Sequence, residues 1–312
     1  MTLADLAAGA MLAALAVYAT TGGADFGGGI WDLLATGPRR ADQRRAIEAA
    51  IAPVWEANHV WLIFVIVVLF TAFPPAFARL GTQFHIPLTL MLIGIVLRGS
   101  AFVFRHDGPR EGSRWGAVFA VSSVTAPFFL GCVLGAMTTG HAWTHPFPVA
   151  VGVLVLATFA FLAAVYLTVE TTADLRADFA RRAELAAIVV AVAGAVVAGL
   201  AYRLDTPFGR ALLTSAWSIP LVVTAIVSLA VTLFALRRAA YRIARLAAIA
   251  VVVLFVVGWG AAQYPVLIAP DLTLANAASP HRTLALLIPI VVGGAAVLVP
   301  SLWYLLRVFK NR

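Results

Sequence analysis

The chain has 312 residues, of which 62% are hydrophobic and only 12% charged. This composition excludes an ordinary soluble domain and is typical of an integral membrane protein. The net charge of +8 could indicate a nucleic-acid partner, but the basic residues are scattered in short loops between apolar runs, so we expect no nucleic acid to bind. Cys132 is the single cysteine, which excludes an intramolecular disulfide and a multi-cysteine metal site.

Apolar runs long enough to cross a bilayer recur along the chain. A hydrocarbon core of about 30 Å needs roughly twenty residues of helix. The first run has no basic region before it and is longer than the apolar core of a cleavable signal, so we expect it to be retained. With no linker between the runs, the sequence predicts an all-α integral membrane protein with one membrane domain over residues 1–312. Its nine predicted transmembrane helices are 3–21, 54–73, 84–104, 116–138, 147–170, 184–201, 212–235, 246–264 and 283–306.

Basic residues are distributed unevenly between the two ends of these helices. Seventeen of the 22 Lys and Arg residues follow the first, third, fifth, seventh or ninth helix, and four lie at the opposite ends. Short loops rich in Lys and Arg stay in the cytoplasm. We therefore predict a multi-pass protein of the bacterial cytoplasmic membrane with its N-terminus outside and its C-terminus in the cytoplasm.

The first predicted helix runs into the sequence GGADFGGGIWDLL, residues 22–34, which holds five glycines and Asp25. One straight helix over residues 3–35 would be about 50 Å long, more than a single crossing needs. The glycines therefore predict either a break in the helix or a very close approach of a neighbouring helix. Both alternatives place Asp25 near the cytoplasmic side.

A polar turn opens the second predicted helix, within APVWEANHVWL at residues 52–62. Glu56 and His59 are three residues apart and share one face of the helix, and Trp55 lies one turn before His59. Acids within membrane helices usually face the bundle interior or a water cavity and mark proton or ion paths. A carboxylic acid beside an imidazole can pass a proton along, so Glu56 and His59 are candidates for a relay.

Arg98 lies in the third predicted helix, about two turns before its cytoplasmic end, at the depth expected for Asp25 and Glu56. Opposite charges at one depth in a membrane are expected to pair. Structural roles remain as alternatives. Arg98 could extend to the headgroups, Trp55 and Trp61 could belong to an interfacial belt, and Glu56 could cap a helix.

The histidines do not predict a haem site on this chain. Of six histidines only His59 lies well inside a predicted helix, since His85 begins the third one at its external end and the other four belong to loops or helix ends. Two facing midplane histidines are therefore not available. A multi-pass ion-coupled transporter or channel is an alternative function, in which buried Asp25, Glu56 and Arg98 would form the coupling site.

These motifs resemble subunit II of the cytochrome bd-type quinol oxidases. Members of that family often carry an Asp-Gly-x-Asp sequence in the first helix; here Gly22 replaces the first acid and Asp25 remains. The resemblance covers nearly the whole chain. It is carried by GGADFGGGIWDLL, APVWEANHVWL, LRGSAFVFR, VYLTVETTADLRADFARRAELAA and YPVLIAPDLTLANAASPHRTL.

The resemblance implies two four-helix bundles plus one peripheral helix, packed as a heterodimer against a related subunit I. It implies that subunit I carries two b-type haems, one d-type haem and the quinol-oxidation loop, whereas this chain binds no haem or metal and has no catalytic residue. The expected complex serves the aerobic respiratory chain, oxidising ubiquinol or menaquinol and reducing O2 to water. The resemblance also allows three further partners: quinone, lipid and a small single-helix accessory subunit.

The resemblance also implies that this chain lines a proton uptake route from the cytoplasm, with the family's acid at Glu56 and its amide at Asn58. Combined with the residues derived above, the candidate proton pathway consists of Glu56, His59, Asp25 and Asn58. The residues expected to support it are Trp55, Trp61 and Arg98.

Overall fold

The structure is a computed structural model that describes residues 2–106 and 114–310; it does not describe the side chains of residues 52–57, 105–106, 303, 305–306 and 308–310. Long helices make up most of the chain. In order they are α1 (Leu3–Leu33), α2 (Arg40–Ala72), α3 (Pro74–Gln83), α4 (His85–His106), α5 (Arg114–Thr139), α6 (Pro146–Glu170), α7 (Ala173–Arg203), α8 (Pro207–Thr214), α9 (Ser218–Arg237), α10 (Tyr241–Gln263), α11 (Leu274–Ala277) and α12 (His281–Lys310). A short antiparallel pair, β1 (Val266–Ile268) and β2 (Leu272–Thr273), precedes α11.

The number of membrane helices agrees with the prediction. Among the described residues, eight helices are long and apolar enough to cross a membrane: α1, α4, α5, α6, α7, α9, α10 and α12. Residues Asn58–Ala72 of α2 and the adjoining α3 pass the same test as a pair bent by 116°, which gives up to nine. The chain is therefore an all-helical, multi-pass membrane protein.

Two boundaries differ from the sequence prediction. The predicted helix 212–235 is divided, since Thr206 accepts a hydrogen bond from the Gly209 amide and starts the separate helix α8, and α9 begins only at Ser218. The predicted helix 184–201 begins earlier, as α7 starts at Ala173. Its first turns carry the charged residues that hydropathy alone had assigned to a loop.

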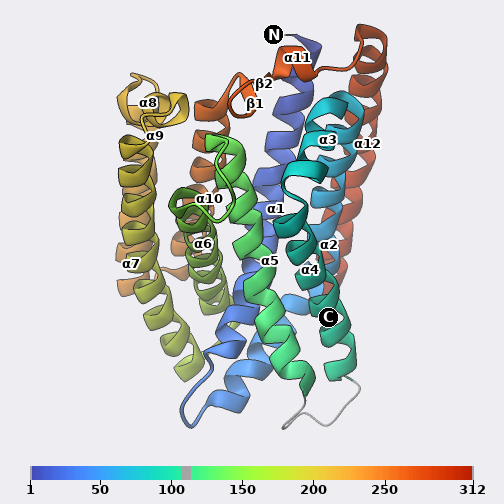
Figure 1. The fold of residues 1–312 in the computed structure, drawn as a ribbon. Helices are drawn as coiled ribbons and strands as arrows, with labels where there is room; N and C mark the ends of the chain where they lie inside the picture. The colour runs from blue at the N-terminus through green and yellow to red at the C-terminus, as the bar shows by residue number, and fades with distance from the viewer. Residues whose placement is uncertain (1, 107–113, 311–312) are drawn as a thin grey trace.

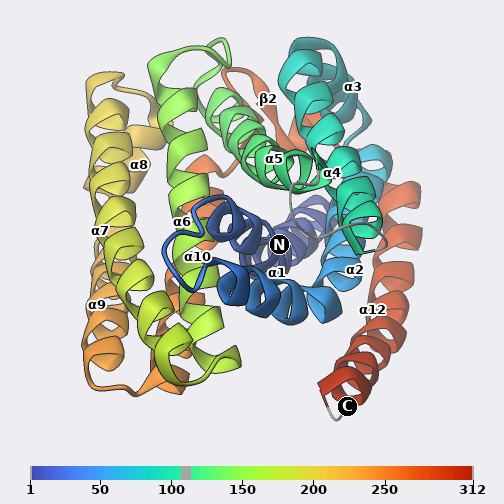
Figure 2. The same cartoon turned by 90° about the horizontal axis from the view of Figure 1, so that it is seen from below.

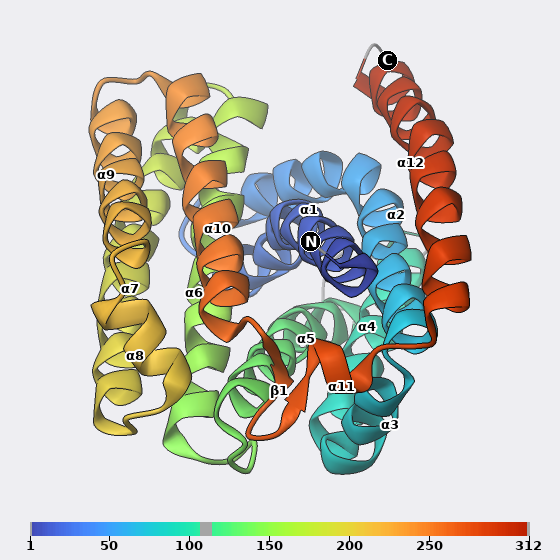
Figure 3. The same cartoon turned by 90° about the horizontal axis from the view of Figure 1, so that it is seen from above.

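Helix α1 lies at the centre of the molecule (Figures 2 and 3), with α6, α7, α9 and α10 to one side and α2, α4 and α5 to the other. Helix α12 runs along the outside beside α2 (Figure 3). The Trp31 indole on α1 donates a hydrogen bond of 2.7 Å to the Ala160 carbonyl on α6, which ties the two groups of helices together. Outward-facing apolar side chains such as Leu185, Ile226 and Ile290 remain exposed, as expected of a surface that faces lipid.

The glycines of α1 mediate close helix contact rather than a break. Helix α1 is continuous over 31 residues, about 46 Å (Figure 1). A Cβ atom on Gly27 would lie 2.0 Å from the Phe159 carbonyl oxygen of α6, and one on Gly29 would lie 2.0 Å from Ser123 Oγ of α5. Only glycine lets these backbones approach so closely. Of the two alternatives left by the sequence, close approach is the correct one.

We predict that Gly27→Ala destabilises the protein by about 1–3 kcal/mol, because the new methyl group would push α1 away from the α6 backbone. Gly9→Ala is the matched control in the same helix, where a Cβ would have no atom within 4 Å. Thermal unfolding in detergent should show a lower midpoint for Gly27→Ala only. Equal midpoints for the two variants would contradict close packing at Gly27.

Candidate functional site

A fully buried ion pair joins α1 to α4. Asp25 is 0% exposed and Arg98 is 1% exposed. Arg98 Nη1 lies 2.9 Å from Asp25 Oδ2, and Nη2 lies 2.5 Å from Oδ1 and 3.0 Å from the Asp25 carbonyl oxygen. This two-pronged geometry is the strongest that a guanidinium and a carboxylate can form. The pairing predicted from depth is confirmed, and the alternative in which Arg98 extends to the headgroups is wrong.

Helix α5 completes the surroundings of Arg98. Arg98 Nε donates to Ser123 Oγ at 3.0 Å, and that hydroxyl in turn donates to the Phe119 carbonyl at 2.6 Å. The guanidinium carbon lies 4.8 Å from the ring centroids of both Phe26 and Phe119. Aromatic faces attract a cation, and all three nitrogens of Arg98 also donate hydrogen bonds. Arg98 is thus fixed by hydrogen bonds to two helices and by two rings.

Helix α2 reaches the ion pair through Asn58. The Asn58 amide nitrogen donates to Asp25 Oδ2 at 2.7 Å, and the residue is fully buried. Its Oδ1 atom is also buried and accepts no hydrogen bond from the described residues. The next residue, His59, places its ring edge-on to Phe26 at 6.2 Å. The buried polar cluster, defined here as Asp25, Arg98, Asn58 and Ser123, therefore joins α1, α2, α4 and α5.

Three further predicted residues belong to α2. Trp61 is partly buried and packs against the main hydrophobic core. Trp55 and Glu56 belong to the α2 helix, but their side chains lie outside the described residues. Their places in the site therefore remain predictions.

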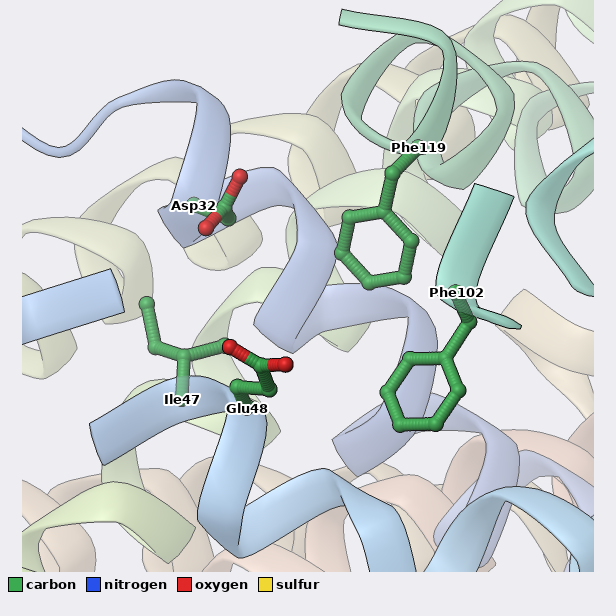
Figure 4. A pocket seen from close by; sticks show the side chains of 5 residues that line it. All are labelled: Asp32, Ile47, Glu48, Phe102 and Phe119. Atoms are coloured by element: carbon green, nitrogen blue, oxygen red, sulfur yellow. The ribbon is translucent and has the colours of Figure 1, made fainter. Parts of the chain in front are cut away.

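A small cavity lies between α1, α2, α4 and α5 on the side of the cluster that faces the α1–α2 loop. Its volume is about 10 Å³, enough for roughly one water molecule. Figure 4 shows Asp32 and Glu48 on one side and the rings of Phe102 and Phe119 on the other. The Phe119 ring connects the cavity to the buried polar cluster, because it lines the cavity and also packs against Arg98.

Sequence reasoning missed the two carboxylates of this cavity. Asp32 is only 2% exposed; Arg44 Nε lies 3.8 Å from its Oδ1, and Arg44 also donates to its carbonyl at 3.3 Å. Asp32 follows Asp25 by seven residues, two helical turns, so the two share one face of α1. That spacing could have identified Asp32. Glu48 gave no such signal, because it lies in a charged stretch that reads as a cytoplasmic loop.

Three of the described histidines can be placed by their ring contacts. His141 and His145 lie in one loop with their ring centroids 4.3 Å apart, and His145 Nδ1 accepts a hydrogen bond from the Phe147 amide. His59 faces Phe26 from α2. The described residues contain no group of three or more His, Cys, Asp or Glu that could bind a metal ion.

The chain matches a known protein family over almost its whole length. The family described as "Cytochrome bd terminal oxidase subunit II" matches residues 3–309. The chain belongs to this family. The expectation from the glycine-rich and APVWEANHVWL motifs is confirmed, and an unrelated transporter or channel is no longer needed to explain the buried charges.

Curated members of the family are similar over part of their length. The cytochrome bd-I ubiquinol oxidase subunit 2 of Escherichia coli K12 is 26% identical over 194 residues, which cover 56% of this chain and 51% of that protein. The cytochrome bd ubiquinol oxidase subunit 2 of Bacillus subtilis is 33% identical over 100 residues, 31% of this chain and 30% of that protein. The chain thus matches about half or less of the length of these two relatives.

A solved structure shares the whole fold. A chain of the bd oxidase from Geobacillus thermodenitrificans superposes with a TM-score of 0.86 and 21% sequence identity, covering 99% of both chains. The fold of that chain is therefore reproduced from end to end.

We predict that Arg98→Gln destabilises this subunit by about 3–5 kcal/mol, because it leaves the Asp25 carboxylate buried without its counter-charge. Arg203→Gln removes the same charge from an exposed position on α7 and should change stability by less than about 0.5 kcal/mol. Thermal unfolding of the purified variants measures both. The role of the ion pair would be refuted if the two variants unfolded at the same temperature.

Proposed function

We propose that this chain is the haem-free second subunit of a cytochrome bd-type quinol oxidase in a bacterial cytoplasmic membrane. The family match over residues 3–309 carries this proposal. The partner is the related subunit I, and the reaction is the oxidation of two quinols, ubiquinol or menaquinol, with reduction of one O2 to two water molecules. The quinols supply four electrons, and the four protons in the water are taken from the cytoplasm.

The haems are proposed to lie in subunit I, where two b-type haems and one d-type haem carry electrons to O2. The family match over residues 3–309, which groups this chain with second subunits, is what supports this division. The task of this chain is then to support subunit I and to conduct protons, and its buried polar groups are the means of doing so.

We further propose that the buried polar cluster belongs to the proton uptake route. The N-terminus would lie outside and the basic loops in the cytoplasm, so that the cavity with Asp32 and Glu48 faces the cytoplasmic side. The Phe119 ring connects it to Arg98 of the buried polar cluster.

Within the route, Glu56 is proposed as the first buried proton carrier and His59 as its neighbour in the relay. Asp25 balances the charge of Arg98, so a proton arriving at Glu56 does not meet an uncompensated cation. Asn58 ties Asp25 to the helix that carries Glu56. Trp55 and Trp61 would keep lipid away from this turn.

We predict that Glu56→Gln lowers oxidase turnover at least tenfold while the haem content of the complex persists, because the amide cannot bind and release a proton. Glu56→Asp should keep much of the activity, since it retains a carboxylate. The measurement is O2 consumption per mole of d-type haem in each purified complex.

A matched control is Glu184→Gln on α7, a partly exposed carboxylate near Arg237 and far along the chain from the cluster. It should leave turnover per haem unchanged. Normal turnover per haem in Glu56→Gln, with reduced assembly only, would instead assign Glu56 a structural role.

A further inference from the structure

The loop between α1 and α2 lies at the same end of the molecule as the start of α7 (Figure 1). Residues of this loop, of α2 and of α7 line a second, larger cavity. Its volume is about 330 Å³. It is lined by the backbone turn of residues 36–38 and by the side chains of Arg39, Gln43, Asp178, Arg181 and Arg182. We call it the arginine cavity. The arginine cavity shares no residue with the buried polar cluster, and the proposed proton route does not pass through it.

The charges in the arginine cavity do not balance. Three guanidinium groups face one carboxylate, Asp178. This carboxylate accepts hydrogen bonds from Arg39 at 2.7 and 2.9 Å, from Gln43 at 3.1 Å and from Arg181 at 3.1 Å. Asp174 also approaches Arg39 at 3.6 Å, but it is 80% exposed and does not line the cavity. An excess of positive charge therefore remains, which favours an anionic ligand.

Arg182 is held in place by neutral groups. Its Nη2 donates to Gln43 Oε1 at 2.8 Å and to the Leu34 carbonyl at 3.5 Å. Its guanidinium carbon lies 5.4 Å from the Trp31 ring centroid and 5.5 Å from that of Phe179. Its Nη1 atom is buried and has no hydrogen-bond partner among the described residues. Because the hydrogen-bond partners of Arg182 carry no charge, its cation is positioned but not neutralised by them.

The surface next to the cavity indicates where the rest of the ligand lies. Arg181 is followed on the same face of α7 by Leu185, Ile188 and Val192, at spacings of four, seven and eleven residues. These three side chains are 64%, 57% and 59% exposed. A positively charged cavity at the end of an exposed apolar stripe matches the shape of a phospholipid, with a charged headgroup above acyl chains.

We propose that the arginine cavity binds the phosphate group of an anionic membrane phospholipid, whose acyl chains lie along the Leu185, Ile188 and Val192 face of α7. Two cationic donors, Arg181 and Arg182, would contact the phosphate, with Arg39 held beside them by Asp178. A bound lipid would then fix the α1–α2 loop to α7. A free phosphate ion would use the same donors but not the apolar stripe.

Native mass spectrometry of the purified complex tests this proposal. The complex is exchanged into detergent containing either phosphatidylglycerol or phosphatidylcholine, and the lipid retained per complex is counted. Arg181→Gln is the informative variant, because Arg181 is exposed and its guanidinium bonds to Asp178, a residue that Arg39 and Gln43 also hold. Arg242→Gln removes the same charge from an exposed position at the start of α10 and is the control.

The expected result is preferential retention of phosphatidylglycerol, reduced about fivefold by Arg181→Gln and unchanged by Arg242→Gln, since a basic residue near the headgroups contributes about 1 kcal/mol. Arg181→Lys should restore most of the retention. Equal retention in the Arg181→Gln and Arg242→Gln complexes would overturn the proposal. So would displacement of the retained lipid by millimolar inorganic phosphate, which would make this a site for a soluble anion.

Discussion

The ion pair between Asp25 and Arg98 determines how the first half of this protein is built. Transferring two charges from water into a helix bundle costs several kcal/mol per ion, and their attraction repays this only with excellent geometry. Here two hydrogen bonds join the guanidinium to the carboxylate. Asn58 donates a further hydrogen bond to Asp25, Arg98 donates one to Ser123, and two aromatic rings pack against the guanidinium. These contacts to the ion pair come from α1, α2 and α5, and Arg98 itself lies on α4, so the four helices must meet at one depth.

Glycine makes that meeting possible. The same turn of α1 that carries Asp25 also carries Gly27 and Gly29, which bring the α6 backbone and Ser123 to within a distance that no other residue allows. Ser123 is the hydroxyl that Arg98 uses. The glycines and the ion pair therefore depend on each other. Close backbone packing at the glycines positions the polar groups, and the polar groups fix the depth at which the helices pack. A proton relay built beside it would have rigid surroundings with balanced charge.

The sequence predicted this arrangement unevenly, for physical reasons. Hydropathy gave the helices, because about twenty apolar residues per crossing is a strict requirement. Depth along the membrane predicted that Arg98 would pair with an acid at its own level, Asp25 or Glu56, and the structure shows the pair with Asp25. The glycine-rich sequence could not distinguish a helix break from close packing, since glycine permits both. Only the position of the neighbouring α6 backbone decides between them. Asp32 could have been identified from its spacing of two turns from Asp25, whereas Glu48 could not, because its charged stretch reads as a loop and only the folded structure brings it to the cavity with Phe102 and Phe119. The place of the Glu56 side chain stays a prediction.

The account as a whole requires this chain to work as the haem-free half of an oxidase. The most direct test is to purify the protein from native membranes through a tag on this chain and to record a reduced-minus-oxidised spectrum. The account predicts b-type and d-type haem absorption in fixed proportion to the chain, together with quinol-dependent O2 consumption and a co-purifying subunit I. A colourless preparation without an oxidase partner would contradict it.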